Sequence, residues 1–344
     1  MDYATRKKYK AWQRKRIIKR VIIPGILLLS FWIFTPFILI TAESTLNSLQ
    51  SFKTGQAISY AFNFDNEQKQ TLENPSIEAS TIILIDECEN LLTDSIDAVL
   101  ERYGNSVAIY YENLKTGCTF THRAEQEFFG ASITKAPYSL WLYTKAERGE
   151  IDLEEILTYS EADYLWGSGI IRDQYSFGHQ FTINRLLELN LSESDNIATQ
   201  MLQRRFHQEG YKDFIASLGG RRDFVGDILG SRLNANEAGL FAREIYKYIQ
   251  SDGQYSQTFK QNLINNQFPF ITADYPVASK TGWYHRYGGA WHDMSIIFAP
   301  SPYILVILSS DKTGTDEDHA TFQLISRAFA EFNDKNFPFF PPLE

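Results

Sequence analysis

The chain has 344 residues, of which 44% are hydrophobic and 15% aromatic, a composition that excludes an intrinsically disordered protein. A chain of this length can bury a substantial core in one or two domains. The formal net charge is -9, but residues 1–20 carry nine Lys or Arg and one Asp, or +8, so residues 21–344 carry -17.

An uncharged, strongly apolar segment follows the basic block, at residues 21–42. As a helix with a rise of about 1.5 Å per residue it would span roughly 33 Å, enough to cross a bilayer core. Since Lys and Arg collect on the cytoplasmic side, we expect residues 1–20 to be a cytoplasmic segment and residues 21–42 a single-pass transmembrane signal anchor. A cleaved signal peptide is the alternative. The basic residues would then set the orientation of the anchor in the membrane and contact anionic lipid, rather than bind nucleic acid.

Residues 43–90 are expected to form a juxtamembrane stalk, because most of this stretch is rich in Ser, Thr, Asn and Gln without sustained periodicity. Ser80–Asp86 is a candidate additional strand. Cys88 and Cys118 would both lie on the outer side of the membrane, where a disulfide is chemically permitted. Two free thiols are the alternative, since the sequence does not fix the distance between them.

Residues 91–344 are expected to form one domain that begins with a helix, Leu91–Tyr103, and ends with an amphipathic helix, Ala320–Phe332. The expected strands are Ser106–Tyr111, Cys118–His122, Val277–Tyr284, Met294–Phe298 and Tyr303–Ser309. The expected helices between them are Ser132–Arg148, Ile183–Leu191, Asp195–His207, Phe214–Leu218 and Glu237–Ser251. This order predicts an α/β fold, an α+β sandwich, whose mainly antiparallel sheet comes from both ends of the domain and whose helical lobe is inserted between them.

A serine and a lysine stand three residues apart at Ser132 and Lys135, where an apolar helical pattern begins. At that spacing both side chains share one helix face. A serine hydroxyl needs a base within reach to attack a carbonyl, and lysine serves as that base only if burial or another cation lowers its pKa. The motif indicates an acyl-transfer site, although a second copy runs from Ser309 to Lys312.

Two further motifs follow Ser132 in chain order, Ser194-Asp195-Asn196 at a loop-to-helix junction and Lys280-Thr281-Gly282 on a predicted strand. The set S-x-x-K, S-D-N and K-T-G resembles the signature of the class A β-lactamase and penicillin-binding protein superfamily, over roughly Leu91–Phe332. Taken alone, Ser194-Asp195-Asn196 also fits a simple helix cap. Lys-Thr-Gly occurs at three other places, but only Lys280 has the order and context of the family.

The resemblance implies a role for each motif residue in acyl transfer. Ser132 is the nucleophile, and Lys135 is the base that accepts its proton. Ser194 relays protons toward the leaving group. Lys280 lowers the pKa of Lys135 by repulsion between like charges and attracts a substrate carboxylate.

The same resemblance assigns the substrate-binding positions. Asn196 would donate to and accept from the substrate amide, while Asp195 braces the loop. Thr281 would hydrogen-bond the substrate carboxylate, and Gly282 leaves room for the ligand beside its strand. The oxyanion would be held by two backbone N–H groups, those of the nucleophile and of Trp283.

One departure from the family concerns removal of the acyl group. Class A β-lactamases use a glutamate in an E-x-x-L-N loop to activate water, and here the corresponding stretch, Leu218–Glu237, is shorter. Leu233-Asn234 keeps the L-N pair without that glutamate. Asp223, Asp227 and Glu237 are the nearby carboxylates, and none of them is assigned as the deacylating base.

Two further features have weaker functional signals. Trp166-Gly167-Ser168-Gly169 is a candidate for the rim of the cleft, with an ordinary interhelical turn as the alternative. The six histidines have no metal-ligand spacing, so neither a metal nor a cofactor is predicted. His285 and His292 flank the K-T-G strand and fit surface or packing roles.

We therefore predict a membrane-anchored, extracytoplasmic serine hydrolase of class A β-lactamase type. It would form an acyl-enzyme at Ser132 on a β-lactam or on a cell-wall amide or ester that contains D-alanine. A D-alanyl-D-alanine carboxypeptidase or a cell-wall esterase is the first alternative, and a non-catalytic module that binds cell-wall fragments is the second. The complete proton-transfer set argues against the second. The expected partners are that substrate and the membrane, with no nucleic acid.

Overall fold

The computed structural model describes residues 91, 94–221, 231–284, 289–310 and 316–338. The predicted anchor, the stalk and the candidate strand Ser80–Asp86 lie outside these residues. In the described ranges, no helix combines the length and the apolar character that crossing a bilayer requires. Cys118 is buried and disulfide-bonded, and the other cysteine of the sequence, Cys88, lies outside the described residues.

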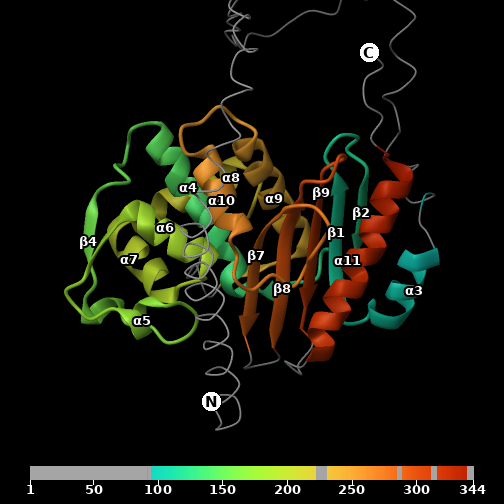
Figure 1. The fold of residues 1–344 in the computed structure, drawn as a ribbon, viewed down its shortest axis with the longest axis horizontal. Coiled ribbons are helices and arrows are strands. Elements are labelled where there is room, and N and C mark those ends of the chain that lie inside the picture. The colour runs from blue at the N-terminus through green and yellow to red at the C-terminus, as the bar shows by residue number, and fades with distance from the viewer. Residues whose placement is uncertain (1–90, 92–93, 222–230, 285–288, 311–315, 339–344) are drawn as a thin grey trace, which may run out of the picture. The chain divides into compact units, whose positions relative to one another are not determined.

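A five-stranded antiparallel sheet forms the centre of the domain, in the order β2-β1-β9-β8-β7 (Figure 1). Its strands are β1 (Val107–Asn113), β2 (Thr119–His122), β7 (Val277–Tyr284), β8 (Ala290–Ile297) and β9 (Tyr303–Ser309). An N-terminal hairpin thus pairs with three C-terminal strands, and β7 lies at the edge. The predicted sheet from both ends of the domain is confirmed.

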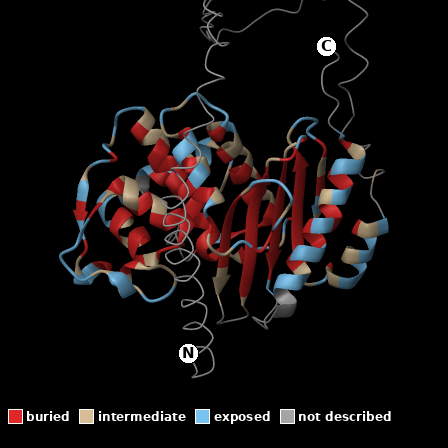
Figure 2. Ribbon diagram, in the orientation of Figure 1, coloured by how far each residue is buried: buried red, intermediate tan, exposed pale blue. Residues whose placement is uncertain are grey.

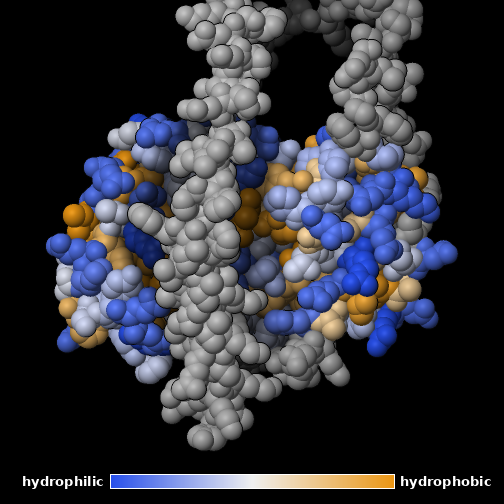
Figure 3. Space-filling model, in the orientation of Figure 1, coloured by the Kyte–Doolittle hydropathy of each residue, from blue (hydrophilic) through white to orange (hydrophobic). Residues whose placement is uncertain are grey.

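Helices cover both faces of this sheet (Figure 1). The first and last described helices, α3 (Asp94–Tyr103) and α11 (Asp316–Asn336), pack together on one face. All residues of strand β1 are buried, and alternate residues belong to two different apolar clusters. Both faces of the sheet are therefore apolar and must pack against helices. Figure 2 shows the resulting layers, with buried strands between helices whose outer surfaces are exposed. In Figure 3 the outer face over α11 and α3 is mostly hydrophilic.

The inserted lobe on the other face is helical, as predicted. Its helices are α4 (Lys135–Glu147), α5 (Ile171–Gln174), α6 (Ile183–Ser192), α7 (Asn196–Phe206), α8 (Glu209–Ser217), α9 (Ala235–Ile249) and α10 (Ser256–Ile264). Two small pairs of strands join them, β3 (Phe128–Phe129) with β6 (Arg232–Leu233) and β4 (Ile156–Thr158) with β5 (Gln180–Thr182). Helix α9 lies directly on the sheet, because Gly239 leaves space for the ring of Tyr110.

The short strands β3–β6 and helix α5 were not among the predicted elements, and α8 begins at Glu209 rather than at Phe214. Three further differences have a physical reason in the sequence. Helix α10 was not expected, because two of its four buried residues are polar, Ser256 and Asn262, and this hides the apolar period. Strand β8 begins at Ala290 rather than at Met294, since the polar His292 is fully buried in it. The helix expected from Ser132 becomes α-helical only at Lys135, and a 3₁₀ turn, Ala131–Thr134, precedes it.

Helix α11 is held to the sheet by aromatic packing and by one buried amide. The ring of Tyr111 stacks on that of Phe329, with centroids 5.4 Å apart, and meets the edge of Phe332 at the same distance. The Tyr111 hydroxyl and the Asn113 amide both donate to Asn333 Oδ1, at 2.8 and 2.9 Å. This contact joins the last helix to the first strand.

Removal of the Phe329 ring should destabilise the domain strongly. Phe329→Ala leaves a cavity between α11 and the sheet, and we expect the free energy of unfolding to fall by about 3–5 kcal/mol. Leu324→Ala is the matched control, because Leu324 lies on the same helix with 41% of its surface exposed and should change stability by no more than about 0.5 kcal/mol. Urea denaturation of the full-length chain measures both, and equal midpoints for the two variants would contradict this packing.

Candidate active site

The proposed nucleophile lies on a tight turn between β3 and α4. Ser132 belongs to the 3₁₀ turn Ala131–Thr134, in which residues three apart are nearly aligned, so Lys135 follows it on the same side. Ala131 has a φ of 47°, in the left-handed region that disfavours residues with a Cβ. The structure keeps this conformation because Gly130 on one side and α4 on the other fix the turn: Gly130 donates its N–H to Ser231 O and accepts that of Ile133.

Lys135 is completely buried at the start of α4. Its Nζ donates to the backbone oxygen of Ser194 at 2.6 Å and to Asn196 Oδ1 at 2.7 Å. The Ser194 hydroxyl lies 3.4 Å from the same amine. The lysine of the first motif is therefore held directly against the second motif.

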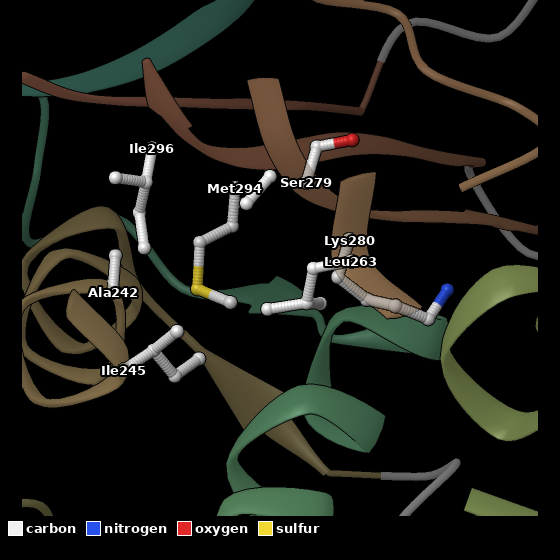
Figure 4. A pocket seen from close by; sticks show the side chains of 8 residues that line it. Ala242, Ile245, Leu263, Ser279, Lys280, Met294 and Ile296 are labelled. Atoms are coloured by element: carbon white, nitrogen blue, oxygen red, sulfur yellow. The ribbon is translucent and has the colours of Figure 1, made fainter. Parts of the chain in front are cut away.

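Lys280 reaches the same hydroxyl from the edge of the sheet. It is fully buried on β7, and its Nζ donates to Ser194 Oγ at 2.9 Å and to the backbone oxygen of Thr281 at 2.9 Å. Figure 4 shows its side chain beside Leu263, with Nζ pointing away from the apolar residues around its stem. Ser194 Oγ thus lies between two buried amines.

Burial changes the protonation of both lysines. It lowers the pKa of Lys135 well below its ordinary value, the charge of Lys280 lowers it further, and the carboxylate of Asp195 partly opposes the change. Burial also lowers the pKa of Lys280, to about 7, against the opposing charge of Asp293. Two interacting amines titrate as a pair, so near neutral pH a neutral amine becomes available as a base.

The Ser194-Asp195-Asn196 loop is braced from within. Ser194 has a φ of 52°, and Asp195 caps α7 by accepting the N–H groups of Ile197 and Ala198 at 2.9 and 3.0 Å. The helix-cap interpretation of this motif is therefore correct for Asp195, and it coexists with the contacts of Ser194 and Asn196 to the lysine.

Strand β7 passes very close to the nucleophile. A Cβ on Gly282 would lie 2.9 Å from Ser132 N and 3.0 Å from Ile133 N, so only glycine fits at this position. The neighbouring Thr281 is fully buried, and its Oγ1 has no hydrogen-bond partner among the described residues. A buried hydroxyl without a partner is costly unless a ligand satisfies it.

The structure thus gathers most of the predicted site residues at the junction of β7 with the helical lobe. These are Ser132, Lys135, Ser194, Asn196, Lys280, Thr281 and Gly282. Trp283 follows on the same strand, with its ring packed on that of Phe268, and no described contact tests its expected part in the oxyanion hole.

Asp293 is a residue that the sequence analysis did not single out. It pairs with Thr281 across β7 and β8, is fully buried, and accepts the N–H groups of Phe270 and Ile271 at 2.8 and 2.9 Å. Burial raises its pKa to about 6. The signal was present in the sequence, because a carboxylate within an apolar strand requires a partner; here its charge favours the ammonium form of Lys280.

His292, next to it, has a packing role. The ring is fully buried, with Nε2 2.8 Å from the backbone oxygen of Phe129 and Nδ1 accepting the N–H of Ser309. Burial lowers its pKa to about 4, so the ring is neutral. His285 lies outside the described residues, among which no group of three potential metal ligands was found.

Of the carboxylates considered for deacylation, Glu237 is the one that lies among the described residues. Glu237 accepts hydrogen bonds from Nε and Nη2 of Arg221, at 2.7 and 2.9 Å, and forms a capping box with Asn234 at the start of α9. Glu237 therefore stabilises the first turn of α9. Asp223 and Asp227 lie outside the described residues, and Leu233 of the L-N pair belongs to β6.

Comparisons with known proteins identify the family and agree with the fold. The sequence model of the beta-lactamase enzyme family matches residues 91–332. A β-lactamase structure from Sphaerobacter thermophilus DSM 20745 has a TM-score of 0.63 at 20% identity and covers 71% of this chain and 98% of its own. A β-lactamase structure from Chitinophaga pinensis DSM 2588 has a TM-score of 0.60 at 19% identity and covers 70% of this chain and 99% of its own.

A third similar structure was solved with its enzyme acylated. It is a variant of PBP-A described as an acyl-enzyme complex with penicillin G, with a TM-score of 0.57 at 17% identity, covering 70% of this chain and 97% of its own. No curated protein matches this chain.

The lowered pKa of Lys280 should appear in the pH dependence of stability. Between roughly pH 7 and 9 the unfolded chain holds a proton that folded Lys280 has released, so the free energy of unfolding rises with pH, by up to about 1.4 kcal/mol per unit for this group. Lys280→Met should make this rise shallower. The exposed Lys247→Met is the control and should leave it unchanged; urea titrations across this range measure the slopes, and identical slopes in all three proteins would refute the shift.

Proposed function

This chain belongs to the beta-lactamase enzyme family and is a serine hydrolase, and we propose that it forms an acyl-enzyme at Ser132. The substrate we propose is a β-lactam or a cell-wall amide or ester that contains D-alanine. One observation carries the proposal: two buried lysines converge on Ser194 Oγ next to the nucleophile turn. Burying two amines in one place costs stability, and titratable groups with such strongly perturbed pKa values cluster at functional sites.

The proposed acylation begins with neutral Lys135, which accepts the proton of the Ser132 hydroxyl as its oxygen attacks the substrate carbonyl. A tetrahedral oxyanion forms, for which the Ser132 N–H next to Gly282 is one of the two expected donors. The carbonyl–leaving-group bond then breaks. Ser194, in contact with both amines, passes a proton to the departing nitrogen or oxygen, which leaves an ester on Ser132.

Substrate binding would adjust the protonation of the site. A substrate carboxylate beside Lys280 favours its ammonium form, and that charge lowers the pKa of Lys135 further. The Thr281 hydroxyl, which has no partner among the described residues, is suited to donate to the same carboxylate. Carboxylate binding at one end of the site would thus activate the base at the other.

A penicillin-binding or D-alanyl-D-alanine carboxypeptidase role, in which the acyl group would leave Ser132 slowly, is the second candidate. The observation behind it is the use of Glu237 in the α9 capping box, where it pairs with Arg221. The acyl-enzyme state in the name of the PBP-A structure agrees with such a role. We further propose, from the sequence of residues 1–42 alone, that the domain acts outside the cytoplasmic membrane and is anchored by one helix.

Labelling with penicillin tests the nucleophile. We expect the full-length chain to gain the mass of one fluorescent penicillin, Ser132→Ala to gain none, and Ser309→Ala, from the second copy of the motif, to be labelled like the unmodified protein. Intact mass and fluorescence give the adduct, and a chromogenic cephalosporin gives turnover. Rapid Ser132-dependent turnover would indicate a β-lactamase, a long-lived adduct a penicillin-binding or peptidase role; an unlabelled wild-type chain contradicts the proposal.

Replacement of the base should slow acylation without unfolding the domain. Lys135→Met removes the proton acceptor while keeping a side chain of similar length, and we expect the second-order rate of penicillin labelling to fall by about 10²–10⁴-fold. Lys145→Met, on the same helix but partly exposed, should label at the normal rate. Stopped-flow or quenched labelling measures both rates; a rate for Lys135→Met within a few-fold of normal would assign the base elsewhere.

A further inference from the structure

Exposed apolar side chains are concentrated beside the candidate site. Six large apolar residues are exposed among those the structure describes, and four of them come from residues 156–177. Three are aromatic: Trp166 is 72% exposed, Phe177 50% and Tyr164 38%. We call Tyr164, Trp166 and Phe177 the rim aromatic surface. Such a concentration on an otherwise polar surface marks a binding site.

The three rings form one connected group. Tyr164 meets Trp166 edge-on, with centroids 5.6 Å apart, and Phe177 edge-on at 6.4 Å. The guanidinium of Arg172 covers the Trp166 ring at 5.1 Å, which orients the indole. The rings therefore present separate faces at steep angles to one another, and do not form one flat apolar plane.

The loop that carries Trp166 is fixed to the catalytic motif. The backbone oxygen of Trp166 accepts Asn196 Nδ2 at 3.1 Å, and Ser168 O accepts Asn196 N at 3.0 Å. A Cβ on Gly167 would lie 2.3 Å from Asn196 Nδ2. The rim aromatic surface is thus held in place by the same asparagine that contacts Lys135.

The net charge around the rim aromatic surface argues against an anionic ligand. Residues 156–180 contain three carboxylates and one arginine, a net charge of -2 with histidine neutral, which repels anionic lipid. Arg172 is paired with Asp173, and the nearby Arg204 with Asp163. Three rings are also far fewer than the 20–30 residues a side that a stable protein interface takes. A small uncharged ligand fits better.

The exposed polar side chains of the same segment indicate what that ligand carries. Residues 156–180 also expose hydrogen-bonding groups, namely Glu161, Gln174, Ser176, His179 and Gln180. Angled aromatic faces suit a puckered ring with C–H groups on its face, and the polar groups suit hydroxyls on its edge. Pyranose sugars have both.

We propose that the rim aromatic surface binds pyranose rings of an uncharged glycan, and that this glycan carries the acyl group attacked by Ser132. The second half rests on the proposed function, whereas sugar binding itself needs no chemistry at Ser132. Substrate attached to a polysaccharide would then be held at two points, the acyl group at the nucleophile and the sugar at Trp166.

Sugar binding is tested on the full-length chain, in a detergent without a sugar head group. The probes are β-1,4-linked tetramers of N-acetylglucosamine and of glucose, titrated by calorimetry and tryptophan emission. At least one tetramer should bind and shift the emission. Trp166→Ala should bind it about tenfold more weakly and lose the shift, while Tyr275→Ala, an exposed aromatic outside the surface, should match the unmodified chain.

Two results would overturn sugar binding: neither tetramer binds at millimolar concentration, or Trp166→Ala binds as tightly as the unmodified chain. Cosedimentation with anionic vesicles that depends on Trp166, without sugar binding, would assign the surface to lipid and overturn it too. Because no acyl donor is present, these results are independent of labelling at Ser132.

The link to catalysis has its own test, competition with penicillin labelling by a D-alanyl-D-alanine peptide with and without an attached disaccharide. The sugar-linked peptide should compete more strongly, and Trp166→Ala should abolish that difference. Equal competition by the two peptides in the unmodified chain, or a difference that survives in Trp166→Ala, would overturn the claim that the glycan carries the acyl group.

Discussion

The burial of two lysine amines against one serine hydroxyl is the constraint on which the rest of this structure depends. Lys135 and Lys280 are both inaccessible to solvent, yet each charge would lose several kcal/mol of hydration there. The site meets this demand in two ways: fixed oxygens accept the N–H groups, and burial lowers both pKa values so that the two amines need not be charged together.

Such a site needs a large and rigid scaffold. Lys280 comes from an edge strand, Lys135 from the first turn of α4, and Ser194 from the loop before α7, so three separate parts of the chain must be positioned together. The continuous apolar cluster between sheet and lobe supplies this rigidity. Strand β7 is the outermost strand of the sheet among the described residues, and Gly282 lets it approach the nucleophile turn closely.

The sequence predicts the reacting residues of this site better than it predicts the buried polar residues that hold them in place. Motif residues such as Ser132 and Lys280 are recognisable because their types and order are unusual, and the sheet strands because their apolar runs are long. The residues that support the site are harder to recognise. Asp293 favours the ammonium form of Lys280 from a neighbouring strand, and Glu237 was one of several carboxylates until the structure showed its capping box with Asn234. Buried polar residues break the apolar period, and their partners lie far away in the chain.

The Asp195-Asn196 pair joins the start of α7, the buried amine of Lys135 and the loop that carries Trp166. Asp195 Oδ1 caps α7, while its Oδ2 accepts the N–H groups of Ile170 and Ile171 from the loop that carries Trp166. Asn196 joins Lys135 to the same loop. A shift of the rim would therefore disturb the acceptors around the base, and rearranging the base would move the rim. These bonds, 2.6–3.1 Å long, join the rim loop to the base, so the sugar binding proposed at the rim and proton transfer at Lys135 would depend on one connected unit.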